Sequence, residues 1–303
     1  MSATAPTSVL PALSPGIRAM ALGAFWFSIM GLLVRLAGER LPTIQVIVLR
    51  CAITLVLSYA ACRQAGIRNV FGDNRRLLLL RGTLGGLGLL FFFHSLVRNP
   101  LAEANLLQYT NPIFAIIIAG VWLKEQVGRA ELLSLAVCIG GVVLITRPAV
   151  IFGVHDGALP ALNVVIGVTG AMFSGAAYAV VRRIGHSEHP TVVVFYLPLM
   201  GLLLSLPLSI GQWEAPTGTE WLLLLGTGIT TQAAQTYMTR GLRLETAARA
   251  TTTGYLQIVF AATWGALVLG EWPPAWTIAG AALIVGSALW LALGKQRGGV
   301  GDE

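Results

Sequence analysis

The chain has 303 residues, of which 55% are hydrophobic and only 11% are charged, whereas an ordinary soluble domain carries about 25% charged residues. With a mean hydropathy of +0.76, the polar residues are too few to cover a globular surface, which argues against a soluble enzyme and against a nucleic-acid-binding module. The net charge of +7 would suit either an anionic partner or a membrane topology signal, and the positions of the charges along the chain decide between the two.

Apolar segments bounded by glycine, proline and charged residues predict an all-α integral membrane protein with ten transmembrane helices, since about 20 apolar residues cross a bilayer. The ten segments are residues 17–36, 43–62, 77–97, 101–122, 130–147, 161–182, 191–211, 219–239, 246–269 and 275–293. Residues 1–16 are expected to form a disordered cytoplasmic tail, 148–160 a connecting loop and 294–303 a second cytoplasmic tail. Cys51, Cys62 and Cys138 lie within or beside apolar segments and are expected to be buried and unpaired.

The lysine and arginine residues indicate the orientation, because positive charge is retained on the cytoplasmic side of a membrane. One set of alternate connections carries Arg18, Arg63, Arg68, Arg75, Arg76, Arg81, Lys124, Arg129, Arg182, Arg183, Arg240, Arg243, Arg249, Lys295 and Arg297. The other set carries Arg35, Arg40, Arg98 and Arg147. We therefore expect both termini in the cytoplasm of a multi-pass protein of the cell (inner) membrane, and we interpret the net charge as a topology signal rather than as a nucleic-acid surface.

A repeat with an offset of 146 residues relates the two halves of the chain. Without a gap, the aligned pairs include Tyr109 with Tyr255, Asn111 with Gln257, Glu125 with Glu271 and Gly140 with Gly286. Residues 17–147 and 161–293 then form two five-helix repeats. Because five is odd, the second repeat enters the membrane from the opposite side, as in many secondary transporters whose substrate site lies near the midplane between the halves. A duplicated membrane scaffold without transport activity is the alternative.

Several short motifs carry a resemblance to a known family. They are Pro100-Leu-Ala-Glu-Ala104, the Asn111-Pro112 step, Trp122-Leu-Lys-Glu125, its counterpart Val268-Leu-Gly-Glu271, and Arg50 in the second predicted helix. With these motifs the chain resembles the EamA-type transporters of the drug/metabolite transporter superfamily over about residues 17–293. The resemblance implies a ten-helix transporter of small metabolites, often an exporter of amino acids or related compounds, and leaves the substrate open.

Polar residues on the predicted helix 219–239 fall on one stripe about 100° wide. They are Gln232, Gln235, Thr236 and Thr239, and Gly228 lies on the same stripe. Such a stripe faces protein or a wet cavity rather than lipid. We interpret it as a cavity wall, which makes Gln232 and Gln235 substrate-binding candidates, and hydrogen bonding between helices is the alternative.

The predicted helix 246–269 carries a second polar stripe, formed by Arg249, Thr253 and Gln257 at intervals of four residues. Its repeat mate, the helix 101–122, places Glu103 and Asn111 on the equivalent arc, with Gln108 beside them. Thr253, Gln257, Gln108 and Asn111 are therefore candidates for substrate contacts. Glu103 at the outer mouth and Arg249 at the inner mouth are candidate gate residues, or else ordinary helix-end charges.

Pro112 and Arg50 are unusual residues at membrane depth. Pro112 has no amide hydrogen, so it is expected to break its helix and to leave the carbonyl of Gln108 without an intrahelical partner; a kink used for packing is the alternative. Arg50 lies about two turns inside the helix 43–62, where an unpaired charge is costly. It must meet a carboxylate, backbone carbonyls or an anionic substrate group. Glu103 is a candidate partner, and both a structural and a substrate-binding role stay open.

Trp26, Ser28, Tyr178 and His94 complete the substrate-binding candidates. Trp26 and Ser28 near the middle of the first helix, with Tyr178, could form a stacking surface, although core packing is the alternative. His94 could carry a proton, since the ordinary pKa of histidine lies near physiological pH; a satisfied residue between helices is the alternative. No HExxH, Walker lysine loop or GxSxG pattern occurs, and we expect no metal, no cofactor and no catalytic residue.

The sequence therefore predicts a secondary active transporter that moves a small polar or amphipathic metabolite, such as an amino acid or a related compound, across the cell membrane by alternating access. Export is expected, driven by the substrate gradient or by proton exchange, with a monomer in the lipid bilayer and no nucleic-acid partner. The alternative is an intramembrane enzyme or lipid-handling protein, in which His94 and Glu103 would have to supply an acid/base pair.

Overall fold

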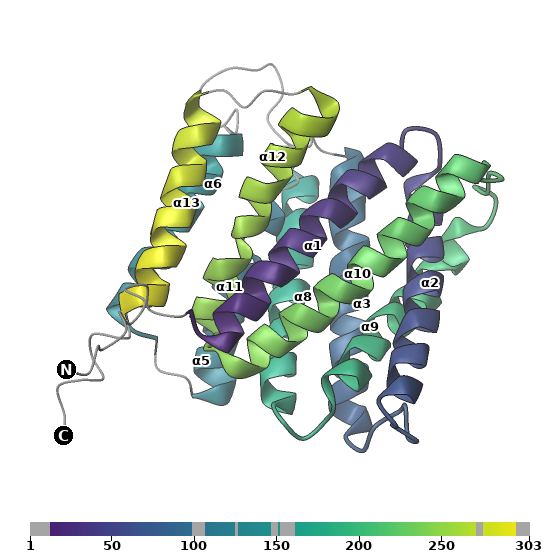
Figure 1. The fold of residues 1–303 in the computed structure, drawn as a ribbon, viewed down its shortest axis with the longest axis horizontal. Coiled ribbons are helices and arrows are strands. Elements are labelled where there is room, and N and C mark those ends of the chain that lie inside the picture. The colour runs from purple at the N-terminus through teal and green to yellow at the C-terminus, as the bar shows by residue number, and fades with distance from the viewer. Residues whose placement is uncertain are drawn as a thin grey trace, which may run out of the picture.

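The computed structural model describes residues 13–98, 107–124, 127–146, 151, 161–270 and 275–294, and the regular structure within these ranges is helical (Figure 1). In chain order the helices are α1 (Pro15–Ala37), α2 (Thr43–Gln64), α3 (Arg75–Arg98), α5 (Asn111–Leu123), α6 (Arg129–Thr146), α8 (Ala161–Ile184), α9 (Pro190–Ser205), the short 3-10 helix η1 (Pro207–Ser209), α10 (Gly218–Leu244), α11 (Ala247–Gly254), α12 (Leu256–Leu269) and α13 (Ala275–Gly294). By length and composition, α1, α2, α3 and α8 contain stretches that are long and apolar enough to cross a membrane.

The start of α1 is set by a capping residue. The Ser14 hydroxyl accepts a hydrogen bond from the Ile17 N–H at 3.2 Å, and Pro15 occupies the first turn, where its missing N–H has no intrahelical partner to lose. Pro15 and Gly16, which were expected in the N-terminal tail, therefore belong to the helix. Residues 1–12 of that tail lie outside the described residues.

The N-terminus of α9 is capped by a histidine. His189 Nδ1 accepts a hydrogen bond from the Thr191 N–H at 3.3 Å, so the cap requires an unprotonated Nδ1. Partial burial, followed by the positive charges of Arg243 and Arg240 at the end of α10, lowers the pKa of His189 below its ordinary value. The folded structure therefore favours the neutral imidazole that the cap needs.

Three of the predicted helices end early or are interrupted. The segment predicted over 191–211 ends as an α-helix at Ser205, just before Pro207 begins the 3-10 turn η1. A continuous helix over 246–269 is wrong, because α11 ends at Gly254 and α12 begins at Leu256. In the segment 101–122, whose first residues lie outside the described part of the chain, a turn at residues 109–110 precedes α5.

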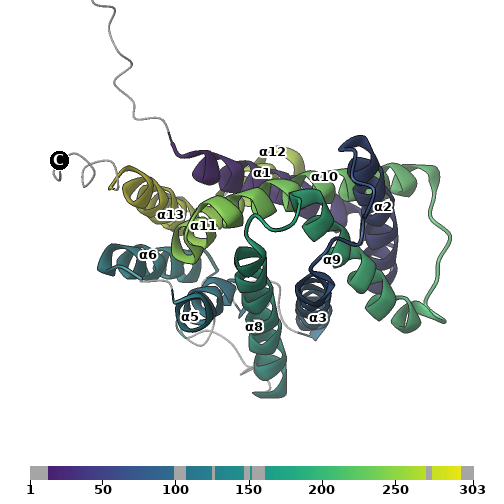
Figure 2. The same ribbon diagram turned by 90° about the horizontal axis from the view of Figure 1, so that it is seen from below.

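The helices pack in pairs that join distant parts of the sequence. α1 lies along α10, α3 along α8, α2 along α9 and α6 along α13 (Figures 1 and 2). Viewed from below in Figure 2, α6 and α13 form one end of the molecule and α2 lies at the other. Glycine permits the close approach of α3 to α8, since a Cβ on Gly88 would lie 3.1 Å from the backbone nitrogen of Ser174.

Buried apolar side chains form two larger clusters along this arrangement. One contains Cys62, Leu78 and Tyr196 and joins α2, α3 and α9; the other contains Cys138 and Tyr255 and joins α6 to the helices of the second half. Cys51, Cys62 and Cys138 are all buried and unpaired, which confirms the expectation from the sequence.

Hydrogen bonds and ion pairs join the loop after α1 to the segment before α10. The Arg40 guanidinium donates from Nε to Glu220 Oε1 at 2.7 Å and from Nη1 to Glu214 Oε2 at 3.2 Å. The Gln45 side chain on α2 donates to the Glu214 carbonyl at 2.6 Å and accepts from its N–H at 2.9 Å. This cluster joins the first and second halves of the chain at the end of the molecule where α1 finishes and α10 starts.

Candidate substrate-binding site

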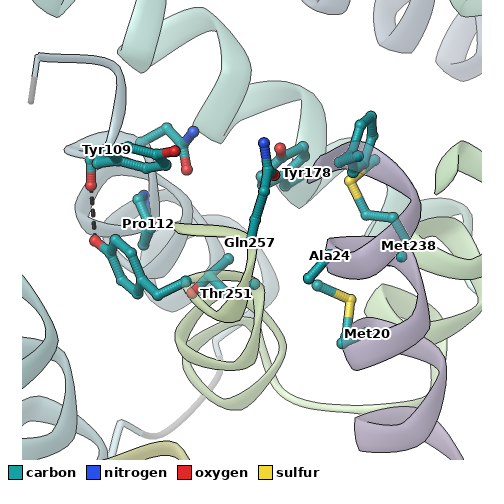
Figure 3. A pocket seen from close by; sticks show the side chains of 13 residues that line it. Met20, Ala24, Tyr109, Pro112, Tyr178, Met238, Thr251 and Gln257 are labelled. Carbon is teal, nitrogen blue, oxygen red and sulfur yellow. Dashed lines mark hydrogen bonds between the residues drawn. The ribbon is translucent and has the colours of Figure 1, made fainter. Parts of the chain in front are cut away.

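The two interrupted helices meet inside the molecule. The turn at Tyr109 and Thr110 precedes α5, and Tyr255 lies between α11 and α12. The Tyr255 hydroxyl donates a hydrogen bond to the Tyr109 backbone carbonyl at 2.7 Å, and the two rings lie 6.0 Å apart at an angle of 49° (Figure 3). Backbone groups freed at helix interruptions are tolerated at membrane depth where they are buried in protein or line a cavity.

A cavity of about 70 Å³ lies beside this junction. It is lined by Met20, Gly23, Ala24, Phe27, Tyr109, Asn111, Pro112, Tyr178, Met238, Thr251, Gly254, Tyr255 and Gln257. The lining therefore comes from α1, α8 and α10 as well as from both interrupted helices. A pocket that encloses a drug-sized ligand measures about 300–1,000 Å³, so this cavity accommodates at most part of a metabolite.

The polar groups of the cavity converge from different helices. The Gln257 side chain extends toward Tyr178, with Tyr109 and Pro112 on one side and Met20, Ala24 and Met238 on the other (Figure 3). Asn111 lies in the first turn of α5 and is 9% exposed. Amide groups can both donate and accept hydrogen bonds, whereas the methionines and Ala24 supply an apolar wall. The arrangement can therefore hold a small molecule with one polar and one apolar side.

Four of the residues predicted from the sequence line this cavity, namely Asn111, Pro112, Tyr178 and Gln257. Pro112 lies in the first turn of α5 rather than in the middle of a continuous helix, because the chain turns two residues earlier. At that position its missing N–H needs no intrahelical acceptor. Gln108, next to the turn, donates to the Ser174 hydroxyl of α8 at 3.2 Å, so it joins two helices at the edge of the site.

Four other candidates lie away from the cavity lining. The Ser28 hydroxyl donates to the Phe25 carbonyl at 2.6 Å and accepts from Trp264 Nε1 at 2.9 Å, which joins α1 to α12. Trp26 packs edge-on against Phe25. The Thr253 hydroxyl donates to the Arg249 carbonyl of its own helix at 2.8 Å. His94 has an exposed side chain on α3.

The polar stripe on α10 faces α2 and α3. Gln232 Oε1 accepts a hydrogen bond from the Ser58 hydroxyl of α2 at 2.6 Å. Gln235 Oε1 accepts from Arg81 Nη2 of α3 at 3.4 Å. The α10 residue in the lining of the central cavity is Met238, and Gln232 and Gln235 make hydrogen bonds between helices.

Of the two proposed gate residues, the structure describes Arg249. Arg249 is 6% exposed and pairs with Glu245, with Nη1 and Oε2 3.4 Å apart. Glu245 also accepts from the Ser14 hydroxyl at the start of α1, and the neighbouring Thr246 hydroxyl donates to Glu131 at 3.2 Å. Arg249 is thus built into a cluster that joins α1, α6 and α11. Glu103 lies outside the described residues.

Several residues of the site were not selected from the sequence. Apolar lining residues such as Met20, Phe27 and Met238 carry no signal that separates them from core residues. The interruption at Tyr255 had a local signal, because three threonines and Gly254 precede it and such residues are poor helix formers. The repeat also aligns Tyr109 with Tyr255, so the two interruptions lie at equivalent positions of the two repeats.

Comparisons with known proteins agree with this architecture. A model of the EamA-like transporter family matches the chain twice, over residues 14–147 and 162–293. The chain belongs to the EamA-like transporter family. It is therefore a multi-pass membrane transporter, as the resemblance in the sequence implied.

Relatives of this EamA-like protein are named as transporters of different kinds. The pseudopaline exporter CntI of Pseudomonas aeruginosa is 34% identical over 289 residues, which cover 95% of this chain and 99% of the exporter. Human solute carrier family 35 member G1 is 27% identical over 97% of this chain and 84% of its own. The riboflavin transporter of Vibrio cholerae is 28% identical over 89% of this chain and 92% of its own. A crystal structure with 20% identity matches with a TM-score of 0.79 over 92% of this chain and 97% of that chain, which shows a shared fold.

Proposed function

We propose that this EamA-like protein is a secondary active transporter that exports a small polar or amphipathic metabolite, such as an amino acid or a related compound, by alternating access. The cavity at the junction of Tyr109 and Tyr255 is the substrate site. This junction is the observation that carries the proposal, because interrupted helices that meet at membrane depth form the substrate sites of many secondary transporters. The substrate gradient or proton exchange supplies the energy.

The proposal includes two inverted five-helix repeats, residues 17–147 and 161–293. Three observations support them. The family model matches the chain twice, and the two interruptions, at Tyr109 and Tyr255, are separated by the repeat offset of 146 residues. The helix pairs also correspond between the repeats. α1 packs on α10 as its repeat mate α8 packs on α3, and α1 packs on α12 as α8 packs on α5. The chain termini are cytoplasmic in this proposal, as the arginine and lysine positions favour.

The size of the cavity supports alternating access. At about 70 Å³ the site holds at most part of a metabolite, so a metabolite enters when the helices that line it separate. One end of the α1–α10 pair is held by Arg40 with Glu220, and the other by the cluster of Glu245 and Arg249. Contacts at both ends are what a carrier must open in turn to expose one site to two sides of a membrane.

Transport is favoured over an intramembrane enzyme. The relatives are named as transporters and exporters. His94, which an acid/base pair would need, has an exposed side chain on α3 and does not belong to the cavity lining. The exporter among the relatives, CntI of Pseudomonas aeruginosa, supports the direction of transport.

Flux in proteoliposomes tests the proposal. The purified protein is reconstituted and assayed with radiolabelled amino acids, nucleobases, vitamins and organic acids, with and without a pH gradient. We expect saturable flux of at least one class. No flux of any compound by protein shown to be folded would contradict the proposed function.

A pair of variants on α12 then tests the site. Gln257→Leu removes an amide from the cavity, and we expect the apparent KM to rise about tenfold, the usual effect of losing one or two hydrogen bonds. Thr263→Val is the matched control, because Thr263 is exposed on the same helix and its hydroxyl donates only to the Val259 carbonyl, at 3.0 Å. Equal kinetics in the two variants would place the substrate site elsewhere.

A further inference from the structure

A second polar site lies between α2, α3 and α10, and it begins with an arginine that the sequence pattern placed in a cytoplasmic connection. Arg81 is only 2% exposed. A Cβ on Gly85, one turn further along α3, would overlap Arg81 Nη1. The guanidinium therefore extends along α3 toward the C-terminal end of the helix. A snorkelling arginine at this position would instead reach back toward the N-terminal end, where it meets water. Glycine at position 85 leaves room for it.

Arg50 of α2 is a second buried guanidinium. It is 8% exposed, its Nη1 lies 3.6 Å from the Met30 sulfur, and its Nε has no hydrogen-bond partner among the described residues. The Nε of Arg81 likewise has none there. A thioether is a weak acceptor, so both cations are poorly satisfied by the parts of the protein that the structure describes.

Gln235 of α10 contacts Arg81 and lines a void together with Arg50. Its Oε1 accepts from Arg81 Nη2 at 3.4 Å, which is longer than the usual 2.7–3.2 Å. Gln235 also lines a void of about 10 Å³ together with Arg50, Thr54 and Thr231, and the buried hydroxyl of Thr231 has no partner among the described residues. Unused donors on three helices, namely Arg50 Nε, Arg81 Nε and the Thr231 hydroxyl, therefore belong to residues that contact Gln235 or line the same void.

The described carboxylates do not neutralise this site. Those with hydrogen bonds or ion pairs are engaged elsewhere: Asp73 with Asn69, Glu131 with Thr246, Glu188 with the backbone of residues 73 and 74, Glu214 and Glu220 with Arg40, and Glu245 with Arg249. Two cations taken out of water are strongly unfavourable unless an anion compensates them, and no carboxylate in the described part of the chain pairs with either guanidinium. Arginine binds carboxylates through paired hydrogen bonds, so a carboxylate suits this site.

We propose that Arg50 and Arg81 bind a carboxylate of the transported metabolite, and that Gln235 Oε1 occupies the place of one carboxylate oxygen when the substrate is absent. This inference rests on the proposed transport function and narrows its substrate class to organic acids and amino acids with a free carboxylate. Met238, three residues after Gln235 on α10, lines the central cavity. The two sites therefore share α10.

The decisive variant is Gln235→Glu, which supplies the carboxylate from within the protein. We expect its melting temperature without ligand to rise above that of the wild type, because the glutamate neutralises the two guanidinium groups. Gln232→Glu is the matched control on the same helix; its side chain meets the Ser58 hydroxyl, so we expect no rise. A Gln235→Glu melting temperature equal to or below that of Gln232→Glu would overturn the proposal.

Ligand binding is measured in detergent with acetate, succinate and L-glutamate, each against its amide at matched ionic strength. We expect at least one acid, and none of the amides, to stabilise the wild type. Binding weakens about ten- to hundredfold in Arg50→Gln and Arg81→Gln, the range for losing charged hydrogen bonds, and is lost in Gln235→Glu. Exposed arginines on the same two helices give the controls Arg63→Gln and Arg76→Gln, which retain binding.

Each other outcome is decisive as well. A wild type that responds to none of the acids, or arginine variants that keep the response, overturns the carboxylate site. Equal stabilisation by chloride or phosphate overturns the assignment to carboxylates. If Arg50→Gln and Arg81→Gln lower the melting temperature without ligand as much as they lower it with ligand, the arginines are structural. Binding and flux are measured separately, so the two proposals can fail independently. Saturable flux of a compound that lacks a carboxylate would support the transport function and refute the carboxylate site.

Discussion

Replacing Tyr255 by phenylalanine tests the junction between the two interrupted helices. The ring is 2% exposed and packs against Tyr109, so phenylalanine keeps the packing and removes only the hydroxyl. The lost hydrogen bond to the Tyr109 carbonyl, 2.7 Å long, contributes a net of about 0.5–1.5 kcal/mol, and a carbonyl left unsatisfied in the protein interior raises the loss toward about 3 kcal/mol. We expect a melting temperature a few degrees lower.

A matched control separates stability from transport. The Tyr196 hydroxyl donates to the Phe71 carbonyl at 2.9 Å, and this tyrosine is also 2% exposed but lies outside the cavity lining. Tyr196→Phe should therefore lower the melting temperature by a similar amount and leave the flux per folded molecule unchanged. Tyr255→Phe should in addition change the apparent KM or the turnover, because the junction borders the substrate. Equal flux in the two variants would refute the idea that the junction belongs to the transport site.

Two further predictions concern packing and pH. A Cβ on Gly175 would lie 2.6 Å from the Asn111 carbonyl oxygen, so Gly175→Ala should destabilise the protein by about 1–3 kcal/mol. Gly140→Ala, with nothing within 4 Å of the new methyl group, should be neutral or slightly stabilising in thermal melts; the same loss in both would contradict the packing. The lowered pKa of His189 means that its contribution to stability is present above the ordinary value of about 6.5 and is lost as the pH falls through the folded-state pKa. His189→Asn, which keeps a good capping residue, should remove that part of the pH dependence of the melting temperature between pH 8 and 5, and an unchanged pH dependence would contradict it.

The architecture and part of the site could be predicted from the sequence. The apolar composition required a membrane protein, the segments located its helices, and the repeat placed Tyr109 opposite Tyr255 and Asn111 opposite Gln257. Both members of each pair line the central cavity. The pattern left two environments open where both give the same signal. Gln232 and Gln235 form a polar stripe that is compatible with a cavity or with neighbouring helices, and periodicity gives the face of a helix without naming what covers it.

Arg81 illustrates most directly what the tertiary structure decided. An arginine near the end of an apolar segment normally reaches back to water. The sequence analysis therefore assigned Arg81 to the positive charges on the cytoplasmic side. Its direction depends on the space left by Gly85 on its own helix and on the position of Gln235 on α10, 154 residues later. The sequence by itself determined that this chain is a helical membrane transporter with two related halves, because hydropathy, charge position and repeat register are local or periodic properties. Which polar side chains share a site depended on the packing of distant helices, because contacts between them are made only when the chain folds.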